Sequence, residues 1–311
     1  MNDPSLSVII PVYNDPTGIE TTLSALTDQD RASTEYEILV VDNGSTDETP
    51  SVIALFEDRY PDLVTALSET TAQNSYVARN RGIAAAEGSF IAFVDADMHA
   101  DPTWVGSVIK GMADNNWRYL GCHVEVYLPK ETLVGKFDSL TGFPVKEYIT
   151  ELHFAPTCCL VVDATVFNEV GRFDDRMISG GDYEFGRRVY DAGIDQHYAA
   201  DVVLYHPVRI SLHADLARHV RIGRGIAQQR RFHADRCGSR YPSLYKLVAP
   251  PRPRNFGEMI GDAKLTASEL AAFYAFEYLE QLARGTGMVY EMGRQFTTPK
   301  QASTSPEEPL S

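Results

Sequence analysis

The sequence predicts an α/β protein with a mostly parallel central sheet, helices on both faces of that sheet, and a helical C-terminal extension. Two observations support this fold class. Apolar stretches of strand length alternate with segments of helical periodicity through about the first 130 residues. The second half contains two longer stretches with helical patterning, at 212–234 and 266–282. Strands that alternate with helices pair in parallel, because each helix carries the chain back to the edge where the strands begin.

The first half is expected to contain four strands, each followed by a helix. Leu6–Val12 is a nearly continuous apolar strand, after which Ile19, Leu23 and Leu26 recur at the spacing of one helix face. Ser45-Thr46-Asp47-Glu48 has the form of a capping box and predicts the start of the second helix. The other strands are expected at 37–41, 63–67 and 90–94, and the other helices at 76–86 and 102–115.

Beyond residue 130 the pattern is less regular. A strand is expected at 157–162, a helix at 181–192 and a short strand at 202–205. We therefore predict three parts of the chain. These are an α/β domain at 1–210, a helical extension at 211–296 that is basic in its first half, and a disordered tail at 297–311.

The composition argues against several classes of protein. There are 28 basic and 43 acidic residues, so the net charge of −15 argues against a nucleic-acid partner. The four cysteines contain no C-x-x-C pair, and we expect reduced, buried thiols with Cys158 and Cys159 on opposite faces of a strand. The N-terminus does not resemble a signal peptide, and no apolar run reaches the ~20 residues of a membrane helix. These features predict a cytoplasmic protein.

Four aspartates fall where a predicted strand ends or a predicted helix begins. Asp42 follows the second strand, Asp95 and Asp97 follow the fourth, and Asp182 opens the helix at 181–192. Ligands of such sheets bind beyond the carboxyl ends of the strands. Two neighbouring acids there could hold a divalent cation such as Mg²⁺ or Mn²⁺, because hard ions prefer oxygen ligands. Each aspartate could equally cap a turn or a helix.

Five motifs occur in order within residues 6–206. They are Pro11-Val12-Tyr13-Asn14, Val41-Asp42-Asn43-Gly44-Ser45-Thr46-Asp47, Ala78-Arg79-Asn80-Arg81-Gly82, Asp95-Ala96-Asp97 and Gly181-Asp182-Tyr183-Glu184. In this order they resemble the motifs of glycosyltransferase family 2, nucleotide-sugar-dependent enzymes of the GT-A fold. The resemblance implies a Rossmann-like GT-A domain at 1–210. It also implies an inverting glycosyltransferase that moves a sugar from a nucleotide donor, typically UDP, to an acceptor hydroxyl.

The resemblance also implies a donor site, formed by Pro11, Tyr13, Asp42, Arg79, Asp95, Ala96 and Asp97. Asp42 would accept a hydrogen bond from the nucleobase, and Asp95 would lie near the ribose. Asp97 would hold the cofactor, Mn²⁺ or Mg²⁺, against the diphosphate. His206 could occupy a late histidine position that contacts the metal, or it could simply be packed at the end of a strand.

Asp182 would be the catalytic base that deprotonates the acceptor, which could be a glycan, a lipid-linked molecule or a small molecule. One departure from the family is Gly181, where relatives carry an acid. Glu184 could supply a carboxylate instead, or it could be a solvated helix residue.

Two other functions compete with this one. A nucleotidyltransferase would share the α/β core and the metal-binding acids, but it would normally carry a Gly-rich, basic loop after the first strand, where this chain has Pro11-Val12-Tyr13-Asn14. The missing G-x-G-x-x-G also disfavours a dinucleotide-dependent dehydrogenase. A carbohydrate- or nucleotide-binding pseudoenzyme is disfavoured by the retained aspartates, whereas Gly181 favours it.

The segment 209–254 is strongly basic, since residues 205–255 contain eleven basic and two acidic side chains. Arg218, Arg221 and Arg224 form a stripe on the predicted long helix, which could be a solvated face, an anion site or a peripheral contact with the inner membrane face. The aromatic residues of the last helix could dock that helix or a second copy in a homodimer; they are Phe273, Tyr274, Phe276 and Tyr278. Trp104 could stack on an acceptor sugar or pack between helix and sheet.

Overall fold

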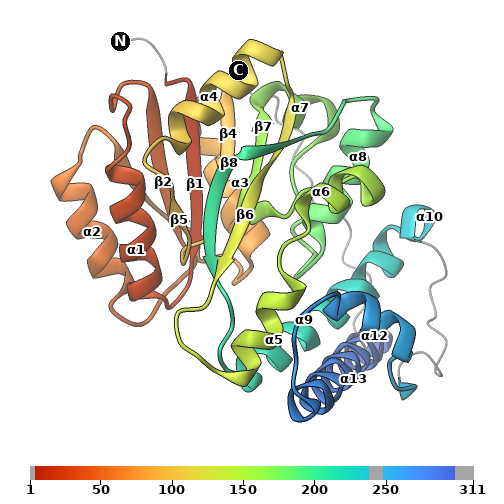
Figure 1. Cartoon of the computed structure of the whole chain (residues 1–311). Coiled ribbons are helices and arrows are strands. Elements are labelled where there is room, and N and C mark those ends of the chain that lie inside the picture. Colours follow the sequence, from red (N-terminus) through yellow and green to blue (C-terminus); the bar gives the residue numbers. More distant parts are fainter. Residues whose placement is uncertain (1–3, 238–247, 298–311) are drawn as a thin grey trace. The chain divides into compact units, whose positions relative to one another are not determined.

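A computed structural model describes residues 4–237 and 248–297, and it confirms the α/β class with a helical C-terminal part (Figure 1). One eight-stranded sheet has the order β3-β2-β1-β4-β7-β6-β8-β5. Its strands are β1 (Leu6–Val12), β2 (Tyr36–Asp42), β3 (Val64–Ser68), β4 (Phe90–Phe93), β5 (His99–Ala100), β6 (Tyr119–Tyr127), β7 (Leu160–Asp163) and β8 (His197–Pro207).

The chain forms two compact units, and the first unit carries almost all of the sheet. It comprises the described residues up to Val126, Phe143–Asp175 and Gly181–Pro207. Its helices are α1 (Pro16–Thr27), α2 (Thr49–Arg59), α3 (Ser75–Ala85), α4 (Trp104–Asn115), α6 (Val145–Glu147), α7 (Ala164–Val170) and α8 (Gly181–Asp191), with a π-helical turn at Tyr148–Leu152. The boundaries predicted from the sequence, 1–210 and 211–296, stay predictions. The tail predicted at 297–311 lies, from residue 298 on, outside the described residues.

Strands β3, β2, β1 and β4 are parallel, as expected. β1 pairs along its whole length with β2, from Leu6 opposite Tyr36 to Val12 opposite Asp42. Along the chain, β2 and then β3 are added on one side of β1, and β4 is added on the other side of β1. Right-handed crossovers therefore place α1 and α2 on one face of the sheet and α3 on the other. Figure 1 shows α3 behind the strands. The carboxyl ends of the four strands therefore meet at one edge of the sheet.

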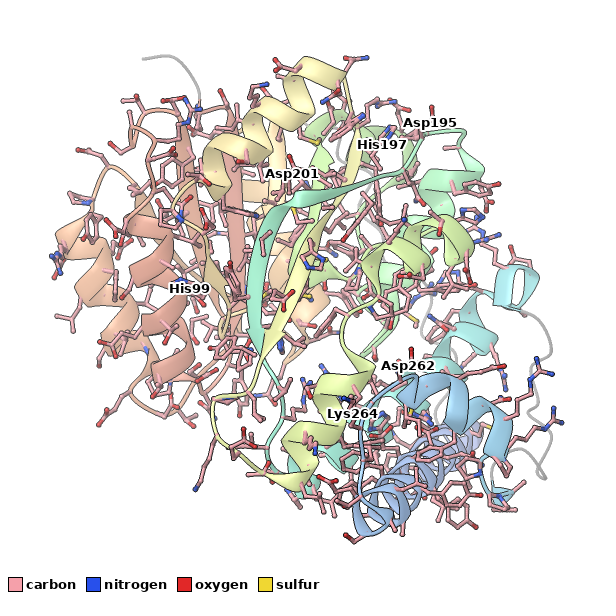
Figure 2. The ribbon with its side chains drawn as sticks, in the orientation of Figure 1. His99, Asp195, His197, Asp201, Asp262 and Lys264 are labelled. Atoms are coloured by element: carbon pink, nitrogen blue, oxygen red, sulfur yellow. The ribbon has the colours of Figure 1, made fainter. Side chains whose placement is uncertain are left out.

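The rest of the sheet contains antiparallel pairs of strands. β7 runs against both β4 and β6, and β5 runs against β8. β8 is longer than the strand expected at 202–205, because it continues through polar positions that interrupt the apolar pattern. His197 and Asp201 are two of these positions, and Figure 2 labels both along the strand.

Two local predictions are wrong. The capping box at 45–48 does not cap α2, which begins at Thr49 with Glu48 at the N-cap position and no side-chain cap. The strand expected at 157–162 begins only at Leu160, because the N–H of Cys159 donates to the carbonyl of Pro156 and closes a 3-10 turn. Cys158 therefore lies in a turn with Cys159, and the two are not on opposite faces of a strand.

Burial settles two further alternatives. Trp104 is 1% exposed at the start of α4, so it packs inside the unit and does not present its ring to an acceptor. The thiols of Cys122, Cys158 and Cys159 are free and buried, as expected. The fourth cysteine is Cys237, whose side chain is outside the described part of the chain.

The second unit is helical and comprises Tyr127–Gly142, Arg176–Gly180 and the described residues from Val208 on. Its helices are α5 (Leu133–Thr141), α9 (Leu212–Phe232), α10 (Ala234–Cys237), α12 (Pro253–Ile260) and α13 (Ala267–Thr297). Among the described residues, no helix combines the length and the apolarity needed to cross a membrane.

An aromatic core holds the second unit together. Phe137 of α5, Phe256 of α12 and Phe273 of α13 are buried in one cluster, and the rings of Phe137 and Phe273 lie 5.3 Å apart. Phe276 packs edge-on against Phe137 at 5.7 Å. The aromatic residues of the last helix thus dock that helix within the unit, whereas homodimer formation stays a prediction.

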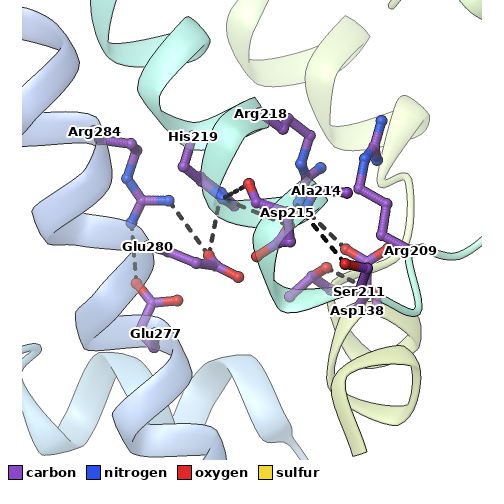
Figure 3. Close-up of polar contacts among 11 residues, drawn as sticks. Asp138, Arg209, Ser211, Ala214, Asp215, Arg218, His219, Glu277, Glu280 and Arg284 are labelled. Carbon is purple, nitrogen blue, oxygen red and sulfur yellow. Dashed lines mark hydrogen bonds and ion pairs between the residues drawn. The ribbon is translucent and has the colours of Figure 1, made fainter. Parts of the chain in front are cut away.

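A buried polar cluster joins α9 to α13 (Figure 3). His219 Nε2 lies 3.2 Å from Glu280 Oε2, and His219 Nδ1 lies 3.6 Å from Asp215 Oδ1. Arg284 contacts Glu280 at 3.5 Å and Glu277 at 3.2 Å. Burial, together with the nearby charges of Asp215 and Glu277, raises the pKa of Glu280 to about 8.

Acidic partners neutralise part of the basic stripe on α9. Arg218 contacts Asp215 at 2.9 Å and Asp138 at 3.2 Å, and Arg224 contacts Glu291 at 3.0 Å. These ion pairs are the reason why the local excess of positive charge is smaller in the folded unit than in the sequence. Peripheral membrane contact through 209–254 stays a prediction, and Arg240 and Lys246 of that segment lie outside the described residues.

Replacing Phe273 by alanine is expected to lower the free energy of unfolding of the helical unit by about 3–5 kcal/mol, because a fully buried ring is removed from a packed cluster. Chemical denaturation followed by circular dichroism measures the change. Leu270→Ala on the same helix is the matched control, since Leu270 is 43% exposed and should cost less than ~0.5 kcal/mol. Equal losses in the two variants would contradict an aromatic core at Phe273.

Candidate functional site

The strand ends of the parallel half carry the first residues of the candidate site. Asp42 is the last residue of β2 and pairs with Val12, and Asp95 follows β4, whose Phe93 pairs with Ile9 of β1. Because adjacent parallel strands end together, the motifs at 11–14, 42–47 and 95–97 share one edge. Tyr13 is exposed there, as a residue that lines a ligand site would be.

Asn14 fastens the first motif to the second. Its N–H donates to Ser45 Oγ at 2.9 Å, and its Oδ1 accepts from the N–H of Thr46 at 2.8 Å. Asp42 Oδ1 accepts from the N–H of Ser45 at 3.1 Å. These bonds explain why Ser45 and Thr46 do not cap α2, and they fix the loop beside the Asp42 carboxylate.

Asn43 holds the segment that leads to α3. Its side-chain amide donates to the carbonyls of Glu69 and Ala72 at 2.9 and 2.8 Å, and its Oδ1 accepts from the N–H of Asn74 at 2.7 Å. Asn74 in turn caps α3 by accepting from the N–H of Tyr76. The second motif therefore positions the helix that carries the third.

Arg79 of α3 binds the first acid of the D-x-D motif. Its Nη2 donates to Asp95 Oδ1 at 2.7 Å, from a guanidinium that is buried beside the half-exposed carboxylate. None of the described residues hydrogen-bonds the buried Arg79 Nε. The loop that carries the D-x-D motif is held by Thr22 of α1, whose hydroxyl donates to the carbonyl of Met98 at 2.7 Å. Arg79 thus offsets the charge of Asp95.

The rest of the third motif serves packing. Asn80 donates to the carbonyl of Phe173 at 2.8 Å and accepts from its N–H at 3.1 Å. Gly82 faces Ile9 of β1 so closely that a Cβ would lie 2.5 Å from the Ile9 side chain. The glycine therefore lets α3 approach the sheet, and this approach puts Arg79 beside Asp95.

Asp97 faces His206 across the β5–β8 pair. In that antiparallel pair, His99, labelled in Figure 2, is opposite Tyr205, so the next residue of β8 lies beside the D-x-D loop. His206 Nε2 is 3.8 Å from Asp97 Oδ1. The ring is buried against Phe143, with centroids 5.0 Å apart, and its Nδ1 has no hydrogen-bond partner among the described residues. His206 is therefore packed, which was one alternative, and it is also close to the acid, whereas contact with a metal stays a prediction.

Asp182 lies in the first turn of α8. Its Oδ1 accepts from the N–H of Tyr183 at 2.9 Å and lies 3.5 Å from the hydroxyl of Tyr76. Burial raises the pKa of Asp182, while the N–H of Tyr183 and the charge of Arg79 act in the opposite direction. A raised pKa makes the carboxylate a stronger base.

Glu184 is not the solvated helix residue considered as one alternative, and a role as the substitute carboxylate stays a prediction. It is 2% exposed and accepts from Nε of Arg188, one turn further along α8, at 2.8 and 3.0 Å. The same guanidinium donates to the carbonyl of Arg172 at 2.7 Å. Glu184 is thus part of a buried ion pair and not a solvated helix residue.

All eight residues assigned to the donor site and the base, and also His206, lie in the first unit. Sequence reasoning missed Thr22 and Tyr76. Tyr76 contacts residues at 181 and 182, which are 105 and 106 positions away, so no local pattern could have revealed its surroundings.

Comparison with known proteins identifies the class to which this fold and site belong. The profile described as "Glycosyl transferase family 2" matches residues 7–170, more than half of the chain, and the chain belongs to this family. The glycosyltransferase AglE of Haloferax volcanii is 37% identical over 226 residues, which cover 72% of this chain and 74% of AglE. The validoxylamine A glucosyltransferase of Streptomyces hygroscopicus is 36% identical, over 61% of this chain and 49% of the relative. These names support a glycosyltransferase over a nucleotidyltransferase.

Solved structures support the fold. The chain is similar to the mannosyltransferase PcManGT of Pyrobaculum calidifontis in complex with GDP-Man and Mn²⁺, with a TM-score of 0.57, 18% identity, and coverage of 96% of this chain and 77% of that one. It is also similar to residues 1–349 of S. aureus TarS in complex with UDP-GlcNAc, with a TM-score of 0.54, 19% identity, and coverage of 94% and 92%. The protein is a glycosyltransferase of the GT-A type.

The described residues contain a second group that could hold a metal ion. Asp215, His219 and Glu280 each offer a ligand atom within 4.8 Å of the others. This group lies in the second unit, whereas Asp97 and His206 lie in the first. Any metal dependence of the protein must therefore be assigned to one of the two sites by experiment.

Proposed function

We propose that this protein transfers a sugar from a UDP-sugar to an acceptor hydroxyl with inversion of configuration, using a divalent cation and Asp182 as the general base. The observation that carries the proposal is the pair formed by Asp97 and His206 next to the ion pair of Arg79 and Asp95. Acids placed in this way at a strand edge can hold a divalent cation, and the cation can in turn bind the negatively charged diphosphate of a donor.

The donor would lie along the edge formed by β1, β2 and β4. The Asp42 carboxylate would accept the N3–H of uracil, with Pro11 and Tyr13 lining the same site. Asp95 would approach the ribose, and the backbone at Ala96 would continue the site toward Asp97. Arg79 already neutralises Asp95, which reduces the repulsion between that carboxylate and a diphosphate.

Asp97 and His206 fit a divalent cation. A carboxylate oxygen and an imidazole nitrogen 3.8 Å apart could both bind Mn²⁺, whereas Mg²⁺ would depend on the carboxylate oxygen. When bound to the diphosphate, such a cation offsets the negative charge that develops on the departing UDP. Asp97 would be the main ligand, since its carboxylate is half exposed.

Asp182 would accept the proton of the acceptor hydroxyl. Removing that proton raises the nucleophilicity of the oxygen, which attacks the anomeric carbon from the side opposite to the diphosphate. A single in-line displacement inverts the configuration. The raised pKa of Asp182 favours proton uptake by this carboxylate at near-neutral pH.

We expect UDP to raise the melting temperature more than GDP, CDP or ADP in the presence of Mn²⁺, and UDP-glucose or UDP-N-acetylglucosamine to release nucleotide faster than GDP-mannose. Asp42→Ala should weaken UDP binding about tenfold or more, because a hydrogen bond to a charged group is lost. Calorimetric titration with UDP measures the change.

Asp47→Ala is the matched control for this experiment. Asp47 lies in the same loop, but its carboxylate accepts from the N–H of Thr49 at 3.0 Å and serves the start of α2. UDP binding should be unchanged in this variant. Tighter binding of GDP than of UDP by the wild-type protein would overturn the assigned nucleobase, and it would leave membership of the family intact.

A further inference from the structure

Position 181 has no side chain, and the ring of Tyr76 occupies the space beside it. A Cβ at position 181 would lie 2.8 Å from Cζ and 2.9 Å from Cε2 of this ring, closer than real Cβ contacts come. Tyr76 is 4% exposed and packs against Phe173, with ring centroids 5.6 Å apart. The glycine therefore allows a phenol from α3 to reach the first turn of α8.

The hydroxyl of Tyr76 contacts both the backbone and the carboxylate of that turn. It accepts from the N–H of Gly181 at 2.9 Å and is directed to Asp182 Oδ1 at 3.5 Å, as a donor. Burial and the charge of Asp182 raise the pKa of Tyr76, so the hydroxyl keeps its proton and remains a donor. It can shorten its bond to Asp182 when a ligand excludes water from the site.

The same tyrosine connects Asp182 to the D-x-D motif. The guanidinium of Arg79 lies over the Tyr76 ring, 5.6 Å from its centroid, and its Nη2 binds Asp95. Asp182, Tyr76, Arg79 and Asp95 thus form one chain of contacts that runs from the start of α8, through α3, to the end of β4.

We propose that Tyr76 is the positioning residue for Asp182, and that its hydroxyl orients the carboxylate toward the acceptor and couples it to the donor-binding acids through Arg79. The inference rests on the proposed role of Asp182 as the base. It also accounts for Gly181, because any side chain at that position would displace the phenol.

Tyr76→Phe tests the proposal by removing the hydroxyl and keeping the ring. We expect kcat to fall roughly tenfold, from the loss of a hydrogen bond to a charged group, with the donor KM within about twofold. A hydroxyl that donates to the ionised carboxylate favours that form, so its loss raises the pKa of Asp182 and moves the acid limb of the kcat–pH profile to higher pH. The assay measures the release of nucleotide from UDP-glucose, UDP-N-acetylglucosamine or GDP-mannose, whichever the wild-type protein turns over fastest.

Two further variants keep the test decisive. Tyr36→Phe removes another buried hydroxyl, which donates to the carbonyl of Leu26. Tyr36 begins β2, whereas Asp42 ends it, so this variant should leave kcat and its pH profile unchanged. Gly181→Ala retains the Tyr76 hydroxyl and the Asp182 carboxylate, but the added methyl group displaces the Tyr76 ring. This variant should therefore show the same loss of kcat, and it replaces Tyr76→Phe if that variant fails to fold.

The outcomes separate the two proposals. A wild-type kcat and pH profile for Tyr76→Phe, together with an inactive Asp182→Asn, would overturn the positioning role and leave the base in place. An equal loss in Tyr36→Phe would also overturn it, because the effect would then come from stability. An active Asp182→Asn would instead overturn the proposed base.

Discussion

Replacing Asp97 by alanine is expected to abolish the stabilisation of this protein by UDP with Mn²⁺. In the wild-type protein, a nucleotide at about 100 times its Kd adds about 2.7 kcal/mol of stability, which raises the melting temperature by roughly 4 °C in a protein of this size. With EDTA in place of Mn²⁺ the shift should be far smaller, because the diphosphate then meets uncompensated carboxylates. In Asp97→Ala, Mn²⁺ should make no difference. Differential scanning fluorimetry measures all four conditions.

The matched control for Asp97→Ala is Glu280→Gln, which removes a carboxylate from the other group of potential metal ligands. We expect its melting temperature to differ from that of the wild type, because the amide replaces a buried acid between Asp215 and Glu277. UDP with Mn²⁺ should nevertheless raise the melting temperature of this variant by as much as it raises that of the wild type. If Asp97→Ala kept this rise and Glu280→Gln lost it, the cation would belong to the second unit, and the assigned donor site would have no metal ligand.

The alternation of strands and helices and the positions of Asp42, Asp95 and Asp97 at strand ends could be predicted because they depend on local pattern. Alternating strands and helices impose a parallel half-sheet, and the carboxyl ends of its strands share one edge. The ion pair of Arg79 with Asp95 could not be predicted from spacing, because it depends on how closely α3 approaches β1 at Gly82.

The failed capping-box prediction has a physical cause, which is competition from bonds between distant segments. Ser45 and Thr46 have the right residue types to begin a helix, yet they bond Asn14, more than 30 positions away, because β1 and β2 end side by side. The burial of Glu184 could not be predicted from spacing, because an arginine four residues further on, such as Arg188, is also common on exposed helix faces. The ion pair of Glu184 and Arg188 is held inside the unit because the Arg188 guanidinium also donates to backbone carbonyls, among them that of Arg172.

Replacing Asp182 by asparagine is expected to lower kcat by about 10²–10⁴-fold, the usual contribution of a general base, while calorimetric binding of UDP stays within about twofold. The pH dependence gives an independent check. A base must be deprotonated, so wild-type activity is lost as the pH falls through the pKa of Asp182. Because burial raises that pKa, the acid limb should lie above the value of about 3.9 for an ordinary aspartate. The residual activity of Asp182→Asn should lack this limb.

Glu184→Gln is the carboxylate control for Asp182→Asn, since it removes the neighbouring acid of the same helix. Its buried ion pair with Arg188 stabilises α8, so the variant should melt at a lower temperature than the wild type, with kcat within a few-fold and the acid limb in place. A large loss of kcat in Glu184→Gln, with wild-type turnover in Asp182→Asn, would move the base to Glu184. That result would require α8 to rearrange when substrates bind, because Glu184 is held away from solvent in the free protein.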